Sequence, residues 1–219
     1  MRKSVMIIMV LTIFGAGKIY AQITPPGSVL TDIKGSNVKE ADADVQGTPY
    51  LFDDWLPGSV VTEDGKTYDN LKLRYNIRFS QLIFLNQNDE VLGFREPVKM
   101  FTINHMVFAN GFPPVDTQTI AAFYQVLADG KIKLLKYSKK VIEERQTYGA
   151  TAMEKSYRKM QSYYIFKDGK MVKVRADKKS LLAALPDHSA QLESYIKDNN
   201  VNLKDDMAIA QVIVYYNTL

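Results

Sequence analysis

Histidine and cysteine, which often act as bases, nucleophiles and metal ligands, are scarce in this chain of 219 residues. There are two histidines, His105 and His188, and no cysteine, so a thiol nucleophile and a cysteine-ligated metal are excluded. Two histidines cannot make a typical zinc site without carboxylate ligands beside them. The motifs HExxH, GxSxG, the P-loop and the dinucleotide-binding glycine pattern are absent. The sequence therefore predicts no catalytic residue, no metal ligand and no cofactor.

Adjacent acidic residues are the remaining candidates for chemistry. They occur as the pairs Asp53-Asp54, Glu143-Glu144 and Asp205-Asp206. Neighbouring residues of a strand point to opposite faces, so Glu143 and Glu144 are not expected to act on one substrate. A carboxylate pair that the fold assembles from distant positions keeps a carboxylate-based hydrolase open as the least favoured alternative.

Aromatic side chains are the candidates for binding. Trp55 is the only tryptophan, and Phe108 and Phe112 flank an Asn-Gly pair in a stretch rich in proline and glycine. Large aromatic residues dominate hydrophobic cores, and core burial is the favoured interpretation of Trp55. The functional interpretation is a rim in which these three rings hold a ligand or a partner.

The tripeptide Asp-Gly-Lys occurs three times, beginning at Asp64, Asp129 and Asp168. Each copy stands between two runs of residues typical of strands. A type I′ hairpin needs a positive φ at both central positions, which glycine accepts freely and aspartate tolerates. A calcium loop would instead need several spaced carboxylates. The three copies are therefore predicted to be hairpin turns.

The N-terminal residues predict export. Two basic residues precede an apolar run and the sequence KIYA, an order typical of a secretory signal peptide over residues 1–21 that is cleaved after Ala21. The protein is then expected in the periplasm or outside the cell. The whole chain has 28 basic and 24 acidic side chains, and loss of Arg2, Lys3 and Lys18 leaves 25 against 24, a net charge of +1. That balance argues against a nucleic-acid partner.

The composition and residue pattern of the rest of the chain change twice. Residues 22–47 are rich in Pro, Gly, Ser and acids, which predicts a flexible lead. Residues 48–176 predict a β-rich domain, because apolar and polar residues alternate strictly over 71–80. Basic residues on the outward faces of these strands argue against an integral membrane protein. Residues 177–219 predict helices that pack on the sheet, with Asp177 and Asp187 as N-caps and Asn202 with Asp205 as a capping box.

Three segments resemble uncharacterised exported proteins of Bacteroidetes-type bacteria: YAQ at the end of the signal, DWLPGSVVTEDGKTYDNLKLRYN, and KKSLLAALPDHSAQLESYIKDNN with VIVYYNTL. The resemblance implies an envelope location and a β-rich domain followed by helices, and it carries no activity. The predicted fold is α+β, with an antiparallel meander or partly closed sheet before a helical segment. We expect a binding or scaffolding module with a protein or a small ligand as its partner. The alternatives are a carrier of a small apolar ligand and the hydrolase.

Overall fold

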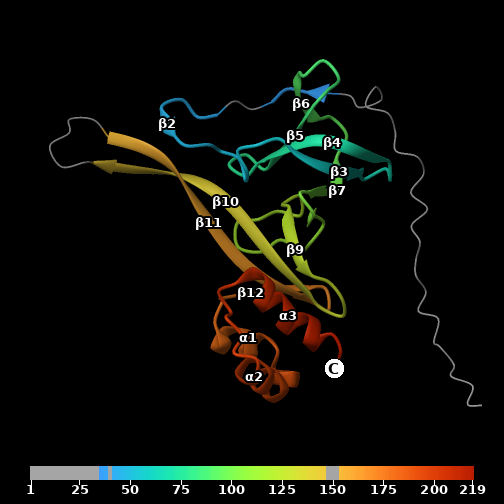
Figure 1. The fold of residues 1–219 in the computed structure, drawn as a ribbon, viewed down its shortest axis with the longest axis vertical. Helices are drawn as coiled ribbons and strands as arrows, with labels where there is room; N and C mark the ends of the chain where they lie inside the picture. Colours follow the sequence, from blue (N-terminus) through green and yellow to red (C-terminus); the bar gives the residue numbers. More distant parts are fainter. Residues whose placement is uncertain (1–34, 39–40, 147–152) are drawn as a thin grey trace, which may run out of the picture.

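The computed structural model describes residues 35–38, 41–146 and 153–219. Within them, twelve strands form one sheet, and three α-helices and a short 3-10 helix follow it (Figure 1). The strands are β1 (Gly35–Ser36), β2 (Val45–Gln46), β3 (Leu56–Thr62), β4 (Thr67–Asn76), β5 (Gln81–Leu85), β6 (Val91–Phe94), β7 (Val98–Ile103), β8 (Met106–Ala109), β9 (Tyr124–Ala128), β10 (Lys133–Gln146), β11 (Met153–Lys167) and β12 (Lys170–Val174). The helices are α1 (Lys178–Ala184), η2 (Pro186–His188), α2 (Ser189–Asp198) and α3 (Asp206–Tyr216).

The sheet runs in the order β1-β6-β5-β4-β3-β7-β8-β9-β10-β11-β12, and the neighbours along this path are antiparallel. The first and last strands of this order do not pair, so the sheet is not closed. Strand β2 lies off the path and pairs with β11 in parallel. These features confirm the predicted fold class.

The lead and the signal peptide have different outcomes. The predicted signal peptide, residues 1–21, lies outside the described residues, as do residues 22–34. Two short strands lie within the segment 22–47 that the sequence predicts as a flexible lead. Strand β1 pairs with β6 near one end of the sheet, and β2 pairs with β11 near the other. The described part of the lead therefore touches both ends of an open sheet.

The alternating stretch 71–80 follows its prediction over most of its length. Leu71, Leu73, Tyr75 and Ile77 are buried, with exposed fractions of 2% or less. Strand β4 ends one residue before Ile77, and a turn leads into β5. The buried face packs against strands β3 and β5 to β8 in a core rich in aromatic rings.

The helices cover the end of the sheet that lies away from β1 and β6 (Figure 1). Their buried residues form a second core with residues of β9 to β12, whose members include Leu134, Ile165, Leu192 and Ile213. Helix α1 begins after Asp177, whose side chain accepts a hydrogen bond of 2.7 Å from the backbone N–H of Ser180. This N-cap is as predicted.

Two other capping predictions are wrong. Asp187 is not an N-cap, because its carboxylate instead accepts hydrogen bonds from Lys167 (2.8 Å) and Tyr216 (2.6 Å) on other elements. Helix α3 is capped by Asp205, which accepts from the N–H of Ala208, while Asn202 accepts from Lys204 in a local turn. Asp187 thus binds partners that are distant in the sequence, whereas at α3 the capping residue is Asp205 rather than Asn202.

All three Asp-Gly-Lys copies lie in hairpin turns, as predicted. Only the copy between β11 and β12 is a two-residue turn, with φ of 49° at Asp168 and 72° at Gly169, as type I′ requires. The loops 63–66 and 129–132 are longer, and glycine alone has a positive φ in each. The type I′ prediction is wrong for these two. Asn217 of the C-terminal segment occupies the second loop and accepts a hydrogen bond of 2.9 Å from the N–H of Ile132.

Strands β10 and β11 continue well beyond their other neighbours. Strand β9 pairs only with residues 134–136 of β10, and β12 pairs only with residues 163–167 of β11. The remaining residues, 137–146 and 153–162, form a two-stranded ribbon that we call the arm. Ten residues of antiparallel strand span about 34 Å. Figure 1 shows the arm projecting past the body of the sheet.

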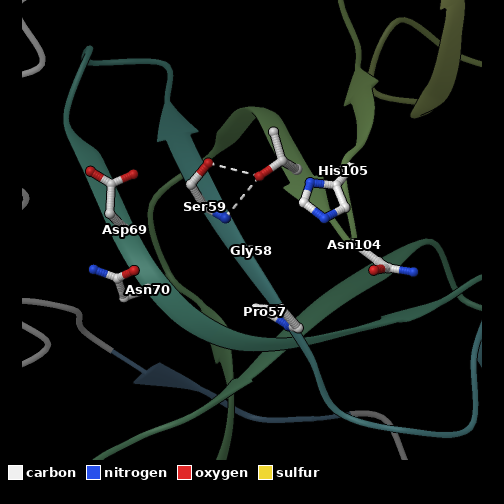
Figure 2. A pocket seen from close by; sticks show the side chains of 8 residues that line it. Pro57, Gly58, Ser59, Asp69, Asn70, Asn104 and His105 are labelled. Carbon is white, nitrogen blue, oxygen red and sulfur yellow. Dashed lines mark hydrogen bonds between the residues drawn. The ribbon is translucent and has the colours of Figure 1, made fainter.

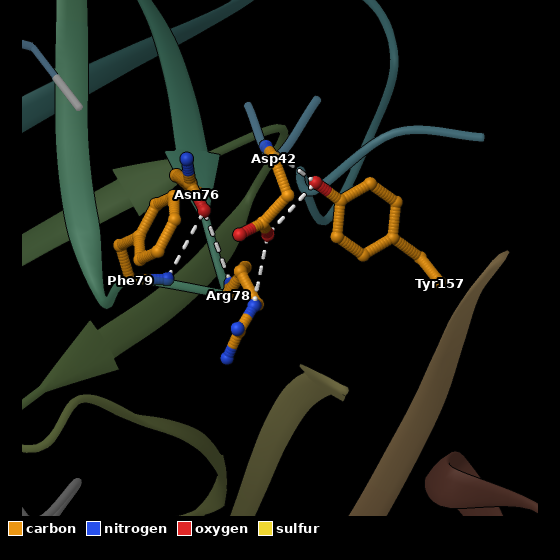
Figure 3. Close-up of polar contacts among 5 residues, drawn as sticks. All are labelled: Asp42, Asn76, Arg78, Phe79 and Tyr157. Atoms are coloured by element: carbon orange, nitrogen blue, oxygen red, sulfur yellow. Dashed lines mark hydrogen bonds and ion pairs between the residues drawn. The ribbon is translucent and has the colours of Figure 1, made fainter. Parts of the chain in front are cut away.

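A small polar cluster, which we call the clasp, fastens the arm to the sheet (Figure 3). One carboxylate oxygen of Asp42 accepts hydrogen bonds from Nε of Arg78 (3.1 Å) and from the hydroxyl of Tyr157 (3.0 Å). The backbone N–H of Asp42 donates to the same hydroxyl at 3.0 Å. Asn76 holds the turn that carries Arg78, because its side-chain oxygen accepts from the N–H groups of Arg78 and Phe79. The clasp thus joins the lead, the β4–β5 turn and β11.

Removing the hydroxyl of Tyr157 tests the clasp. We expect Tyr157→Phe to lower the free energy of unfolding by about 1 kcal/mol, because two hydrogen bonds are replaced by contacts with water. Amide exchange in β2 should also become faster, because β2 begins only three residues after Asp42. Tyr195→Phe is the control, since the hydroxyl of Tyr195 has no hydrogen bond among the described residues. Equal stability and equal exchange in both variants would contradict this role for the clasp.

Candidate functional site

A polar groove of about 600 Å³ lies across strands β3, β4 and β7 (Figure 2). It is open to solvent. The residues that line it come from three strands and one turn, and they are Pro57, Gly58, Ser59, Asp69, Asn70, Thr102, Asn104 and His105. Hydroxyl, amide, carboxylate and imidazole groups thus meet on one surface, although Ser59 and His105 are 46 residues apart in the sequence.

Two local departures from regular strand geometry form the groove. Gly58 pairs with Leu71 while Val60 pairs with Tyr68, so two residues of β4, Asp69 and Asn70, face one residue of β3. This arrangement is a β-bulge, and Asn70 takes a φ of 57° within it. Gly58 is required beside the bulge, because a Cβ there would lie 2.1 Å from the carbonyl oxygen of Thr102.

The opposite wall is the turn between β7 and β8. Asn104 and His105 are its two central residues, with φ of 45° and 65°. Two positive values in a two-residue hairpin match type I′ geometry, here without glycine. The turn carries the exposed imidazole of His105 at the side of the groove (Figure 2).

The hydrogen bonds of the groove do not activate a nucleophile. The hydroxyls of Ser59 and Thr102 lie 2.9 Å apart, and the N–H of Ser59 donates to the hydroxyl of Thr102 at 3.0 Å. Among the described residues, His105 makes no hydrogen bond to Ser59 or to Asp69. A serine nucleophile needs a base within hydrogen-bond reach, and that base needs an orienting group. The groove therefore offers polar binding groups without the arrangement of a catalytic triad.

A second cavity, of about 220 Å³, contains an ionic cluster that the sequence did not predict. The carboxylate of Asp116 accepts hydrogen bonds from Lys173 Nζ (2.6 Å) and from the hydroxyl of Tyr164 (2.8 Å). The hydrogen bond from Lys173, and then that from Tyr164, lowers the pKa of Asp116. Burial is the main cause that raises the pKa of Tyr164. A loop, β11 and β12 bring these groups together, and no sequence motif marks them.

The three aromatic candidates do not meet in one rim. Phe108 is 3% exposed and stacks on Phe101 at 4.8 Å between ring centroids, inside the core of β3 to β8. Phe112 is 8% exposed and belongs to a separate buried cluster with Tyr124. Trp55 is half-buried, and the guanidinium of Arg74 lies 5.3 Å from the centroid of its ring. The two phenylalanines thus stabilise the interior, and Trp55 is covered in part by a cation.

Two of the three acidic pairs divide between different partners, while Asp53 and Asp54 are both exposed just before β3. Glu143 forms ion pairs with Arg145 and Arg158, while Glu144 pairs with Lys155 on the other face of the arm. Asp205 caps α3, and Asp206 contacts Lys136. No group of three or more His, Asp or Glu side chains that could hold a metal ion occurs among the described residues.

Comparison of the chain with protein-family models, with curated proteins and with solved structures returns no match. A search of the described helices also finds none of the length and hydropathy that crossing a membrane requires.

The rings of Tyr124 and Tyr164 are in contact, with centroids 5.6 Å apart, but their hydroxyls differ, and this difference can be tested. This oxygen has no hydrogen-bond partner among the described residues. Removing an unpaired buried donor should be neutral or stabilising, so we expect Tyr124→Phe to raise the free energy of unfolding at pH 7 by up to about 1 kcal/mol. Tyr164→Phe, the control in the same cluster, should lower it by about 1–2 kcal/mol, because its hydroxyl donates to a carboxylate.

The stability of Tyr124→Phe should also depend on pH differently from that of the unaltered protein. Burial raises the pKa of Tyr124 from 10.0 to about 12. The neutral phenol is favoured in the folded state, so its contribution is complete below pH 10 and is lost as the pH rises from 10 towards 12. Urea unfolding between pH 8 and pH 12 should therefore give a shallower loss of stability for Tyr124→Phe than for the unaltered protein. Parallel curves would contradict the burial of this hydroxyl.

Proposed function

We propose that the protein is an exported binding module, and that the arm is where it holds a partner protein. The observation that carries this proposal is the length of the arm that has no third strand beside it among the described residues. A two-stranded ribbon is at best marginally stable in water, and strands of 14 and 15 residues exceed the usual length of about 5–6 residues. Strand β2 adds a third strand opposite only two residues of β11. A partner that pairs with the arm would supply the missing neighbour.

The exposed strand edges and side chains of the arm also favour it as the binding surface. Unpaired strand edges present rows of backbone donors and acceptors that attract another chain. Met153 and Met160 of β11 are 51% and 38% exposed, and flexible methionine side chains suit a protein-binding surface. The arm thus combines unpaired backbone with apolar side chains at a distance from the helices.

The two alternatives receive less support. An apolar-ligand carrier needs an interior space, but aromatic rings fill the interior between β3 and β8. A carboxylate hydrolase needs two carboxyl groups on one substrate, and two of the three adjacent acidic pairs separate into capping and ion-pair roles. In the polar groove, no base among the described residues lies within hydrogen-bond reach of Ser59, so this serine is not activated as a nucleophile.

Site-specific photo-crosslinking tests the proposal. A benzophenone amino acid replaces Met160 on the arm or, as the control, Met207 on α3, which is 70% exposed. In the cells that produce the protein, we expect one dominant protein adduct from position 160 and none of that mass from position 207. The arm is not the binding surface if position 160 gives no adduct, or if both positions give the same adducts.

A further inference from the structure

Within the described ranges, one stretch of β11 has no paired strand on its outer side. Strand β2 pairs with Lys155 and Ser156, and β12 pairs with residues 163–167. Residues 157–162 lie between them and pair only with β10 among the described residues. We call these six residues the open segment. Four of them in a row, Arg158 to Gln161, are exposed.

The backbone groups that face this gap follow from the neighbouring turn. A two-residue turn is closed by a hydrogen-bonded pair, here Lys167 with Lys170. In an antiparallel strand the N–H and C=O groups alternate between the two neighbours. Counting back from Lys167 in steps of two, the backbone groups of Lys159 and Gln161 face the open side, while those of Met160 and Ser162 face β10. The open segment thus offers donors and acceptors spaced for one more strand.

Basic side chains surround the open segment on both faces of the arm. On one face Lys159 lies directly opposite Lys140, a pair of like charges that destabilises a ribbon on its own. On the other face Lys139 lies opposite Met160, next to Arg158. Burial, followed by the ammonium groups of Lys136 and Lys140, lowers the pKa of Lys159, and the carboxylate of Asp206 opposes this shift.

Most of the nearby acids form ion pairs or hydrogen bonds with other residues. Asp206 contacts Lys136 and accepts a hydrogen bond of 2.7 Å from the hydroxyl of Tyr163. Glu143 pairs with Arg145 and Arg158, and Asp116 pairs with Lys173. Lys139 and Lys159 make no ion pair among the described residues, and Lys140 Nζ donates to the carbonyl of Thr48 rather than to an acid. Asp116 attracts Lys139, Asp206 attracts Lys159 and Asp53 attracts Lys140, in each case without an ion pair among the described residues. Ammonium groups that no carboxylate of the described chain contacts are therefore gathered at the open segment.

We propose that the open segment binds an extended acidic segment of the partner protein as an added strand between β2 and β12. The backbone groups of Lys159 and Gln161 supply the pairing, and acidic side chains of the added strand neutralise Lys139 on one face and Lys140 with Lys159 on the other. Successive side chains of a strand point to opposite faces, so acids at neighbouring positions of the partner reach both basic clusters. This inference rests on the proposed function and names the chemistry of the partner.

Peptide binding to the purified mature protein tests the inference. The probe is a fluorescein-labelled eight-residue peptide of glutamate, valine and threonine, measured by fluorescence anisotropy. Two control peptides accompany it: one with lysine in place of each glutamate, and one N-methylated at alternate amides. N-methylation removes the donors of a strand without changing charge. We expect each control to bind at least about tenfold more weakly, because two or more ladder hydrogen bonds or several charge contacts are lost.

Two protein variants locate the site. Lys159→Glu should weaken binding of the acidic peptide about tenfold or more, since it reverses one charge in the pair with Lys140. The substitution removes a like-charge contact, so the fold is expected to remain intact. Lys72→Glu is the matched control, because Lys72 is an exposed lysine on β4 away from the arm, and it should leave binding unchanged. Gln161→Pro removes one outward N–H and should also abolish binding, while Gln161→Thr should not.

Each outcome separates the two proposals. Equal binding of the acidic peptide and its N-methylated form would show attraction of a polyanion, and would overturn strand addition. Equal effects of Lys159→Glu and Lys72→Glu would overturn the location. Failure of the acidic peptide to bind, with a photo-adduct still formed at position 160, would overturn this inference and leave the proposed function standing. Failure of both experiments would overturn both.

Discussion

The pairing of β10 with β11 is the interaction on which the rest of the structure depends. The two strands pair in a continuous register along all 14 residues of β10. One half of this hairpin lies among β9, β12 and the helices, where Leu134 and Ile165 enter the helical core. The other half is the arm, which reaches the β4–β5 turn through the N–H of Lys140 and the carbonyl of Ile77 at 3.3 Å. A single hairpin therefore connects two separate hydrophobic cores.

Polar contacts hold this hairpin in place at both ends. At the helical end, Lys136 is buried to 8% exposure and contacts Asp206 of α3, which also accepts a hydrogen bond from Tyr163. Burial, and then the hydrogen bond to Asp206, raises the pKa of Tyr163 and keeps its hydroxyl a donor. At the other end the clasp joins β11 to the lead. Between these two attachments, residues 157–162 of the hairpin pair with no strand but β10 in the described part of the chain, and lysines without ion pairs lie beside them. An acidic segment that forms a strand would satisfy both features.

The features that could be predicted from the sequence are those set by neighbouring residues. Alternation predicts the buried face of β4, and the Asp-Gly pairs mark three hairpins. In α3 the residues at i, i+3, i+4 and i+7, a spacing typical of one helix face, are all buried: Ile209, Val212, Ile213 and Tyr216. A period of two or of 3.6 is a direct consequence of local geometry, so it is visible in a short stretch of sequence.

The features that could not be predicted depend on partners far away in the chain. Asp187 binds Lys167 and Tyr216 rather than capping a helix, because those side chains arrive from β11 and α3. The bulge at Asp69 and Asn70 exists only in relation to the register of β3. The same holds for the open segment. Its residues alternate like those of any strand, and what sets them apart is where β2 and β12 stop pairing.

Amide hydrogen exchange of the purified protein, resolved residue by residue by NMR, tests the central claim most directly. Strand β11 contains its own controls, because Met160 and Ser162 face β10, and Ile165 faces β12. If the open segment is unpaired in the free protein, the amides of Lys159 and Gln161 should exchange at least about tenfold faster than those of Met160, Ser162 and Ile165. If Lys159 and Gln161 exchange as slowly as Ile165, the edge is already covered, and the account of this strand as a docking site is wrong.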